Sequence, residues 1–239
     1  MKTALVTAAS RGIGRATAVR LGRDGFRVAV NYARDEAAAK ETVRLVEEAG
    51  GSAFAVRAEL GAEGGVERLA EAIDTLDVLV NNVGIGLHEP FGEVTQESYD
   101  RMFAVNVRAP FFLTQRLLPL IPDGGRIVNV TSGVTRIAFP DGIVYAMTKG
   151  ALHLLTLNLA KQLGPRGITV NNVAPGIIDT DANAWLHEDP AAYDFAASRH
   201  ALARVGTPEE IADVVAFAVS DAARFVTGTT LDATGGANL

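Results

Sequence analysis

Thr3–Ala18 reads TALVTAASRGIGRATA, and this stretch decides the fold of the chain. Its apolar start suits a short buried strand, and the segment from Gly12 onward has the apolar spacing of a helix. Gly12 and Gly14 allow the backbone to come close to a bound group. A helix N-terminus adds free N–H groups and a partial positive charge, which favour a phosphate. The stretch therefore favours a diphosphate-binding turn, and a glycine turn without a ligand is the alternative.

The alternation of short apolar runs with longer helical segments continues to the end of the chain. The predicted strands are Thr3–Thr7, Arg27–Asn31, Ser52–Arg57, Asp77–Asn81, Arg126–Thr131, Thr169–Ala174 and Leu231–Ala233. The predicted helices are Gly12–Arg23, Asp35–Ala49, Val66–Ile73, Gln96–Leu120, Val144–Leu163 and Pro208–Val219. Residues 179–204 are expected to be irregular. This order is typical of one α/β domain, residues 1–239, in which helices cover both faces of a doubly wound parallel sheet of about seven strands.

Composition excludes several kinds of protein. The 239 residues are 48% hydrophobic with a formal net charge of −6, and Lys and Arg are scattered along the chain. Nothing resembles the basic stripe of a nucleic-acid-binding protein. The absence of cysteine excludes disulfides and thiolate metal ligands, and no metal site is expected. No apolar run approaches the roughly 18 residues of a membrane helix, and the N-terminus lacks a signal-peptide core, so we expect a cytoplasmic protein with no membrane partner.

The end of the second predicted strand bears on the choice of dinucleotide. Enzymes that prefer NAD usually place a carboxylate there to bind the adenosine ribose. Here Asn31 and Tyr32 stand at the strand end and Arg34 follows. Arg34 and Arg11 can both reach a 2′-phosphate with charge-assisted hydrogen bonds. NADP(H) is therefore preferred and NAD(H) stays possible, because Arg34 also fits a solvated helix start where Asp35 competes for its charge.

A tyrosine and a lysine, Tyr145 and Lys149, open a long apolar helix in the middle of the chain. A spacing of four residues places both on one helix face, one turn apart. An adjacent cation lowers the pKa of a phenol, normally near 10, by roughly 1 to 3 units, which would make Tyr145 usable near neutrality. Ser132 ends a buried strand 13 residues before Tyr145. Taken alone, the spacing also fits a half-buried tyrosine beside a snorkelling lysine.

Together these motifs resemble the short-chain dehydrogenase/reductase family across essentially the whole chain, and most of all its 3-oxoacyl-[acyl-carrier-protein] reductase-like group. The resemblance rests on the turn Thr7–Gly14, the segment Asn81–Gly84, Asn106, the spacing of Ser132, Tyr145 and Lys149, the turn Pro175–Gly176 with Thr180, and the stretch Arg204–Ala212. It implies a Rossmann-like fold and an oxidoreductase that transfers a hydride between NADP(H) and a carbonyl or secondary alcohol.

The resemblance also implies a role for each site residue. Ser132 would bind the substrate oxygen, Tyr145 would donate or accept the proton, and Lys149 would lower the phenol pKa and hold the nicotinamide ribose. Asn106 would steady a water near Lys149, with a helix-interface amide as the alternative. The cofactor would be held by Ala8, Ser10, Arg11, Gly12, Ile13, Gly14, Asn31, Tyr32, Arg34, Glu59, Leu60, Asn82, Gly84, Tyr145, Lys149, Pro175, Gly176, Ile178 and Thr180.

Three residues depart from the family pattern near the adenosine half of the site. Ala8 stands where the first motif glycine is usual, and a left-handed conformation there would cost roughly 1 kcal/mol. Val83 replaces a usual alanine, and Glu59 stands where aspartate is common. These changes are expected to affect cofactor affinity and to leave the reaction intact.

Residues 179–204 are expected to form a lid that sets substrate specificity. Its large side chains can close over an apolar or ring-shaped substrate, or pack within the lid or against another subunit: Trp185, Leu186, His187, Tyr193, Phe195 and His200. An acidic carrier protein needs a basic approach surface, to which Arg166 contributes, whereas Asp123 opposes it. The substrate is thus a small ketone or alcohol, or an acyl thioester.

Two other functions are possible on this scaffold, and the presence of Asn106, Ser132, Tyr145 and Lys149 together argues against a loss of activity. One is a cofactor-binding regulator without turnover, and the other is dehalogenation of a halohydrin on the same scaffold, against which Gly12, Gly14 and Lys149 argue. By resemblance the chain assembles as a homotetramer or a homodimer. The apolar helical stretch Ala151–Leu157 permits such an interface or simply covers the sheet.

Overall fold

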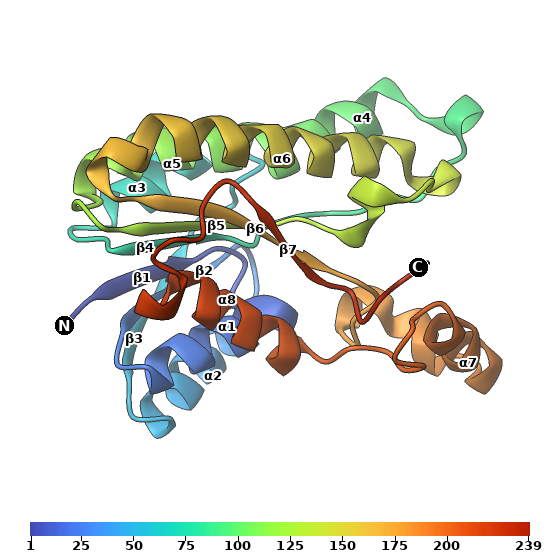
Figure 1. Cartoon of the computed structure of the whole chain (residues 1–239), viewed down its shortest axis with the longest axis horizontal. Helices are drawn as coiled ribbons and strands as arrows, with labels where there is room; N and C mark the ends of the chain where they lie inside the picture. The colour runs from blue at the N-terminus through green and yellow to red at the C-terminus, as the bar shows by residue number, and fades with distance from the viewer.

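Parallel strands form the central sheet of the computed structural model, which describes residues 1–239 (Figure 1). The strands are β1 Thr3–Val6, β2 Arg27–Tyr32, β3 Ser52–Arg57, β4 Val78–Asn81, β5 Arg126–Val130, β6 Thr169–Pro175 and β7 Thr230–Ala233. Their order across the sheet is β3-β2-β1-β4-β5-β6-β7, and every neighbouring pair is parallel. The predicted doubly wound parallel sheet and its seven strands are confirmed.

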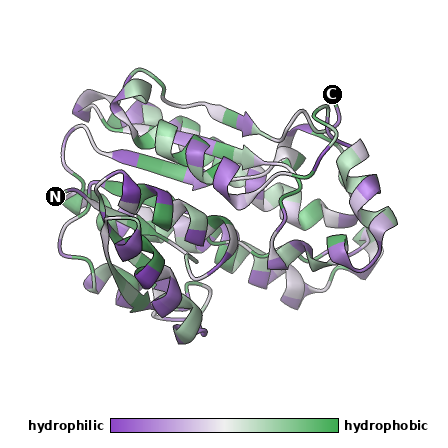
Figure 2. Cartoon of the chain, turned by 90° about the horizontal axis from the view of Figure 1, so that it is seen from below, coloured by the Kyte–Doolittle hydropathy of each residue, from purple (hydrophilic) through white to green (hydrophobic).

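Helices cover both faces of this sheet (Figure 1). One layer contains α1 Gly12–Arg23, α2 Glu36–Glu48 and α8 Pro208–Val219. The opposite layer contains α3 Gly65–Glu71, α4 Gln96–Phe103, α5 Ala109–Leu117 and α6 Ile143–Leu163. Both layers carry hydrophilic as well as hydrophobic residues (Figure 2), as expected for helices that bury only one side.

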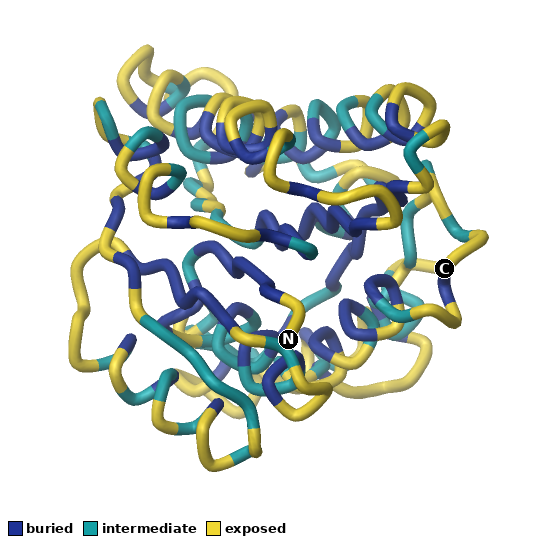
Figure 3. The backbone as a smooth tube through the Cα atoms, turned by 90° about the vertical axis from the view of Figure 1, so that its left-hand side faces the viewer, coloured by how far each residue is buried: buried dark blue, intermediate teal, exposed yellow.

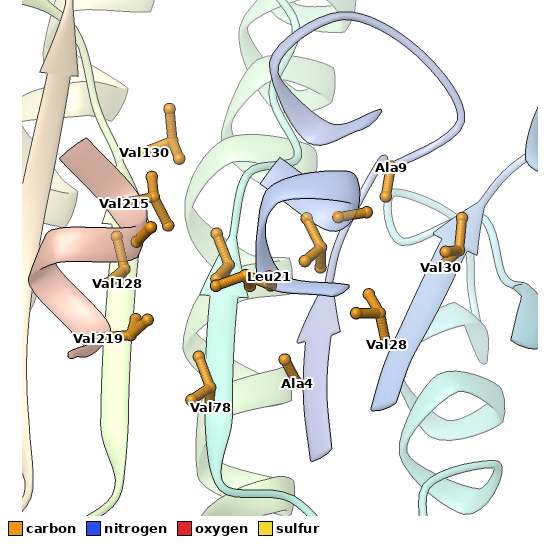
Figure 4. Close-up of a cluster of buried hydrophobic side chains, with 14 of the residues drawn as sticks. Ala4, Ala9, Leu21, Val28, Val30, Val78, Val128, Val130, Val215 and Val219 are labelled. Atoms are coloured by element: carbon orange, nitrogen blue, oxygen red, sulfur yellow. The ribbon is translucent and has the colours of Figure 1, made fainter. Parts of the chain in front are cut away.

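The side chains of a central strand contribute to two hydrophobic cores, one on each face of the sheet, because successive side chains point to opposite faces. In β1, Ala4 and Val6 belong to the core beneath α1 and α8, whereas Leu5 belongs to the core beneath α5. Leu21 and Val215 close the first core from the helix side (Figure 4). The central strands are consequently buried along their length (Figure 3).

A ladder of buried polar side chains crosses the sheet on the side of α5 and α6. Nδ2 of Asn81 donates to Oδ1 of Asn129 at 2.8 Å, and Nδ2 of Asn129 donates to Oγ1 of Thr156 at 2.8 Å. Thr156 in turn donates to Oδ1 of Asn172 at 2.6 Å, and Asn172 donates to Thr230 at 3.2 Å. Because each buried polar group left unpaired costs about 1 to 3 kcal/mol, the ladder fixes the register of four neighbouring strands, β4 to β7.

The helix predicted over Gln96–Leu120 is present but not uniform. A π-helical turn, Ala104–Arg108, separates α4 from α5, and a 3-10 turn, Leu118–Leu120, follows. Pro110 has no N–H to donate to the carbonyl four residues earlier, which belongs to Asn106. The local widening of the helix accommodates this missing α-helical hydrogen bond.

The segment from Asp179 to Arg204, expected to be irregular, is mostly helical, so that prediction was wrong. It forms a 3-10 segment, Asp181–His187, and helix α7, Pro190–Ser198 (Figure 1). Asp189 caps α7 by accepting a hydrogen bond from the N–H of Ala191 at 2.9 Å, and Pro190 suits the first helical position. The helical spacing of apolar residues is weak in this sequence because the segment packs on only a few residues. They form a small separate core of Leu186, Ala196 and Val205.

Candidate active site

The carboxyl ends of the parallel strands all lie at the same end of the sheet. The loops that follow them carry most of the residues predicted to bind the cofactor and the substrate. β2 and β3 lie on one side of β1, whereas β4 to β7 lie on the other. The chain therefore changes direction between β1 and β4. In an open α/β sheet, ligands bind in the crevice at such a switch point.

The turn after β1 is hydrogen-bonded to the segment after β4. Oγ1 of Thr7 accepts from the N–H groups of Asn82 and Val83, both at 2.9 Å. Nδ2 of Asn82 donates to the carbonyls of Thr7 at 2.9 Å and Ala8 at 3.3 Å. Gly14 packs so closely that a Cβ there would collide with the Ala8 carbonyl. The turn is thus held firmly, and the Asn82 amide serves this purpose.

The start of α1 fits a diphosphate. Arg11 at the N-cap makes no side-chain capping bond, and the first turn of the helix holds no acidic residue, so its N–H groups are open to an anion. Gly12 has a φ of +52°, which favours glycine, and a Cβ on it would lie 3.4 Å from Cγ2 of Thr180. The structure therefore brings Thr180 next to the turn. Ser10 and Ile13 flank the same turn.

Ala8 adopts the left-handed backbone conformation, with a φ of +50°. This is the conformation in which alanine was expected to be less stable than glycine. The cost is about 1 kcal/mol relative to glycine. Asn31 offsets part of it by accepting a hydrogen bond from the Ala8 N–H at 3.1 Å. Nδ2 of Asn31 donates to the carbonyls of Val56 and Ala58, at 3.3 and 3.1 Å. Asn31 is 2% exposed, so the structure places it beneath the turn as a support.

Arg34 and Arg11, the two arginines expected to reach a 2′-phosphate, are each paired with a carboxylate. Arg34 lies 2.9 Å from Glu59, and Arg11 lies 2.8 Å from Asp35 and 3.5 Å from Asp181. All these side chains are at least 44% exposed, and exposed pairs contribute only about 0 to 1 kcal/mol. A phosphate can therefore displace them. Tyr32 and Leu60, which were also predicted to contact the cofactor, are buried at the ends of β2 and β3.

Ser132, Tyr145 and Lys149 come together after β5 and in the first turns of α6. Nζ of Lys149 is buried and donates to the carbonyl of Val130 at 2.9 Å. It lies 5.6 Å from the centroid of the Tyr145 ring. The Ser132 hydroxyl lies near enough to the Tyr145 phenol to lower its pKa. The spacing of four residues thus produces the predicted proximity.

The expected lowering of the Tyr145 pKa by Lys149 is not found. Burial raises the pKa of the phenol above its usual value of 10.0, and the Ser132 hydrogen bond only partly opposes this rise. Lys149 does not contribute because its ammonium points to the Val130 carbonyl. Burial in turn lowers the pKa of Lys149 from 10.5 to about 8. Tyr145 is therefore a protonated phenol at neutral pH.

Asn106 lies in the π-helical turn and is fully buried. Its Oδ1 accepts from the N–H of Ile85 and its Nδ2 donates to the Ile85 carbonyl, both at 2.8 Å. Nδ2 also donates to Oγ1 of Thr148 at 3.0 Å. The side chain thus joins the segment after β4 to α6, as in the helix-interface alternative. Gly84 lies in the same segment, and a Cβ on it would crowd Nζ of Lys149 at 3.1 Å.

The segment after β6 leaves the sheet at the same end as the turn after β1. Pro175 ends the strand, and a Cβ on Gly176 would lie 2.8 Å from the Thr234 carbonyl oxygen. Ile178 is buried and forms a parallel bridge with Gly206. These contacts fix the path of the chain between β6 and the lid.

The lid residues divide into internal and exposed groups. Trp185 packs on the lid core, and its Nε1 donates to Asn183 at 3.2 Å. His200 is buried: its Nδ1 lies 2.8 Å from the Ala196 carbonyl oxygen, and its Nε2 accepts from the N–H of Ile177 at 3.4 Å. Within the aromatic set, Tyr193 and Phe195 are exposed, at 36% and 60%. Packing within the lid is thus observed for Trp185 and His200, whereas Tyr193 and Phe195 are open to a ligand or to another subunit.

Two aromatic residues near Tyr145 were not singled out from the sequence. His88 lies in the segment after β4, and Phe139 lies between β5 and α6. Their rings meet edge to face, with centroids 5.4 Å apart. The available signal was positional, because both segments follow the carboxyl end of a central strand.

No group of three or more His, Cys, Asp or Glu side chains is arranged to hold a metal ion. None of the helices combines the length and the apolar character that a membrane-spanning helix requires.

Comparison with known sequences supports a dehydrogenase or reductase. A family model described as enoyl-(acyl carrier protein) reductase matches residues 7–238. An uncharacterised oxidoreductase of Methylorubrum extorquens is 42% identical over 240 residues, covering 98% of this chain and 97% of that protein. The 3-oxoacyl-[acyl-carrier-protein] reductase FabG of Staphylococcus epidermidis is 36% identical over 241 residues, 98% of each protein.

Solved structures give closer matches. The reductase LugOII, which catalyses keto-reduction at C1 during lugdunomycin biosynthesis, is 50% identical with a TM-score of 0.96, covering 100% of this chain and 98% of that one. The landomycin C-6 ketoreductase LanV with bound NADP and rabelomycin is 47% identical with a TM-score of 0.92, covering 99% and 96% of the two chains.

The fold and these comparisons define a nicotinamide-dependent oxidoreductase. The chain belongs to the short-chain dehydrogenase/reductase family. The resemblance inferred from the motifs is confirmed.

The lowered pKa of Lys149 should make the stability of the cofactor-free protein depend on pH. Because its folded pKa of about 8 lies below the ordinary value of 10.5, the unfolded state binds more protons between these two values. Stability should rise with pH across this window as the buried amine loses its charge. We expect the wild-type free energy of unfolding in urea, minus that of Lys149→Met, to increase by more than about 1 kcal/mol from pH 7.5 to pH 10.

Lys161→Met is the matched control, because Lys161 is exposed on the same helix and its replacement should give a pH-independent difference. A flat difference for Lys149→Met as well would contradict the assigned burial effect.

Proposed function

We propose that this chain is an NADP(H)-dependent ketoreductase that reduces a ketone on a fused-ring aromatic substrate. The observation that carries the proposal is the meeting of Ser132, after β5, with Tyr145 and Lys149 in the first turns of α6, at the carboxyl ends of the strands. The substrate class draws support from relatives that are 47–50% identical, one of which binds rabelomycin and NADP.

The chemistry assigned to each residue follows from its surroundings. NADPH, when bound, supplies a hydride to the carbonyl carbon. Ser132 donates a hydrogen bond to the carbonyl oxygen, and Tyr145 transfers its hydroxyl proton to the same oxygen as the carbon–oxygen double bond becomes a single bond. Because its pKa is raised, the phenol keeps its proton at neutral pH, which is the state that a proton donor requires. Lys149, buried beside the phenol ring, would hold the ribose hydroxyls of the bound nicotinamide nucleotide.

Asn106 acts as a positioning residue in this proposal. Its side chain holds Ile85 and Thr148, which flank Gly84 and Lys149. Its backbone carbonyl lacks the usual α-helical donor because Pro110 has no N–H, so this oxygen is suited to hold a water on the path to Lys149.

The proposed chemistry predicts a specific defect in Tyr145→Phe. The variant keeps the ring and loses only the hydroxyl, so it should bind NADPH within about threefold of the wild type. Turnover of a simple fused-ring ketone, 1-tetralone, should fall at least about 100-fold, as expected when a general acid is removed. NADPH fluorescence measures binding, and the decrease in NADPH absorbance measures turnover.

The same assay separates the proposed substrate class from its alternative. An acetoacetyl thioester tests the 3-oxoacyl substrate of FabG-like relatives. Arg166, which was expected to contribute a basic approach surface, is paired with Asp123 at 2.9 Å, which weakens the case for an acidic carrier. A higher kcat/KM for the thioester than for 1-tetralone would overturn the assigned class, and residual turnover above about one tenth in Tyr145→Phe would overturn the assigned acid.

The proposed preference for NADP(H) rests on Arg34 and Arg11. Their carboxylate partners are exposed, so a 2′-phosphate can replace them as the anion. Arg34→Ala should raise the KM for NADPH about tenfold and leave the KM for NADH unchanged. Arg23→Ala, at the far end of α1, is the matched control and should change neither value. A wild-type enzyme with a higher kcat/KM for NADH than for NADPH would refute the preference.

We also propose assembly as a homotetramer. Exposed apolar side chains lie on both outer helices: Phe111 and Phe112 on α5 are 43% and 44% exposed, and Leu154 and Leu157 on α6 are 60% and 51% exposed. A second copy of this chain would cover such faces. Light scattering should give about four times the chain mass of 25.1 kDa. The double variant Leu154→Glu with Leu157→Glu should have a lower mass, whereas a monomeric wild type would disprove the assembly.

A further inference from the structure

The segment Gly86–His88 is presented beside Tyr145 by anchors on either side of it. Ile85 is held by the two hydrogen bonds to Asn106. On the other side, Glu89 accepts a hydrogen bond from the Ser98 hydroxyl at 2.6 Å. The chain between these anchors is short, so the Asn106 side chain, which also bonds Thr148 of α6, restricts the position of His88.

The His88 imidazole and the Tyr145 phenol face the same small space above Gly86. A Cβ built on Gly86 would lie 3.8 Å from Nε2 of His88 and 3.6 Å from Cδ2 of Tyr145. Glycine at this position keeps the space open on the side of the phenol. Nε2 of His88 and one side of the Tyr145 ring therefore border the same space.

Phe139 fixes the orientation of the His88 ring. The two rings meet at an interplanar angle of 87°, which is the favourable edge-to-face arrangement. The Phe139 ring packs against Gly142, and a Cβ there would collide with it. Gly142 is the N-cap of α6, so the pair His88 and Phe139 connects the segment after β4 to the start of the helix that carries Tyr145.

The polar chemistry of His88 is not used within the protein. The hydrogen bonds of its segment run through Ile85 and Glu89, and the imidazole is exposed. An exposed aromatic ring with a free donor and acceptor, held edge-on by a phenylalanine, is suited to a flat ligand that carries a hydroxyl group.

We propose that His88 is a substrate-binding residue that selects hydroxylated fused-ring ketones. Its Nε2 forms a hydrogen bond with a phenolic hydroxyl on the ring that bears no ketone, while the Phe139 edge holds the imidazole in place. The proposal rests on the proposed ketoreductase function and deepens it, because it names the substituent that the site recognises. The competing explanation is that His88 only packs against Phe139.

The test compares 1-tetralone with its 5-, 6- and 7-hydroxy derivatives in wild type, His88→Phe and His88→Gln. His88→Phe keeps an aromatic ring against Phe139 and loses the hydrogen bond, whereas His88→Gln keeps a hydrogen-bonding side chain. In the wild type, the kcat/KM for at least one hydroxy derivative should exceed that for 1-tetralone by about five- to tenfold, the effect of one net hydrogen bond. His88→Phe should lose this preference, so that the two kcat/KM values become about equal, and it should change the kcat/KM for 1-tetralone less than threefold. His88→Gln should keep part of it.

Calorimetric titration of the preferred derivative into NADP-bound protein measures the same preference without turnover. Loss of the binding preference in His88→Phe supports the proposal, and its retention, or a wild type that shows no preference, overturns it. If the wild type binds NADPH but reduces none of these ketones, the proposed function fails, and the titration still decides the role of His88.

Discussion

The rest of the site depends on one constraint: the hydrogen bonds that hold the segment from residue 81 to residue 85, at the end of β4, to the structure around it. Asn81 points into the polar ladder of the sheet, and Asn82 turns the other way to hold the phosphate turn at Thr7. A few residues later Ile85 is held by Asn106. One short segment thus fixes the sheet register, the cofactor turn and the edge of the substrate space, and a shift of any one of them would disturb the others.

Much of the fold could be predicted from the sequence because it depends on periodicity. Buried parallel strands appear as short apolar runs, and α1 and α8 have the boundaries that their turn residues predict. The proximity of Tyr145 and Lys149 also follows from helical geometry alone. In contrast, α7 was missed because it packs on few residues, and the interruption of the long helix depends on Pro110, whose effect on hydrogen bonding is not visible in an apolar pattern.

The parts of the site that could not be predicted depend on which way a side chain turns. The sequence places Lys149 next to Tyr145, but its ammonium points to the Val130 carbonyl, so burial decides the phenol pKa. Arg34 was expected to reach a 2′-phosphate, with Asp35 as the competing charge, and the structure pairs it with Glu59 instead. His88 was overlooked because a single exposed histidine has no spacing partner in the sequence; only the fold brings it beside Phe139.

The separate core of residues 179–204 has a consequence for how this enzyme can change. Leu186, Ala196 and Val205 form a cluster distinct from the two cores that flank the sheet. Substitutions on the outer side of α7 therefore alter the surface offered to a ligand without loosening the strands that carry the cofactor turn. If residues 179–204 bind the substrate as we expect, substrate range and hydride chemistry can evolve independently, because mutation of the lid can admit a new substrate while the redox reaction is inherited unchanged.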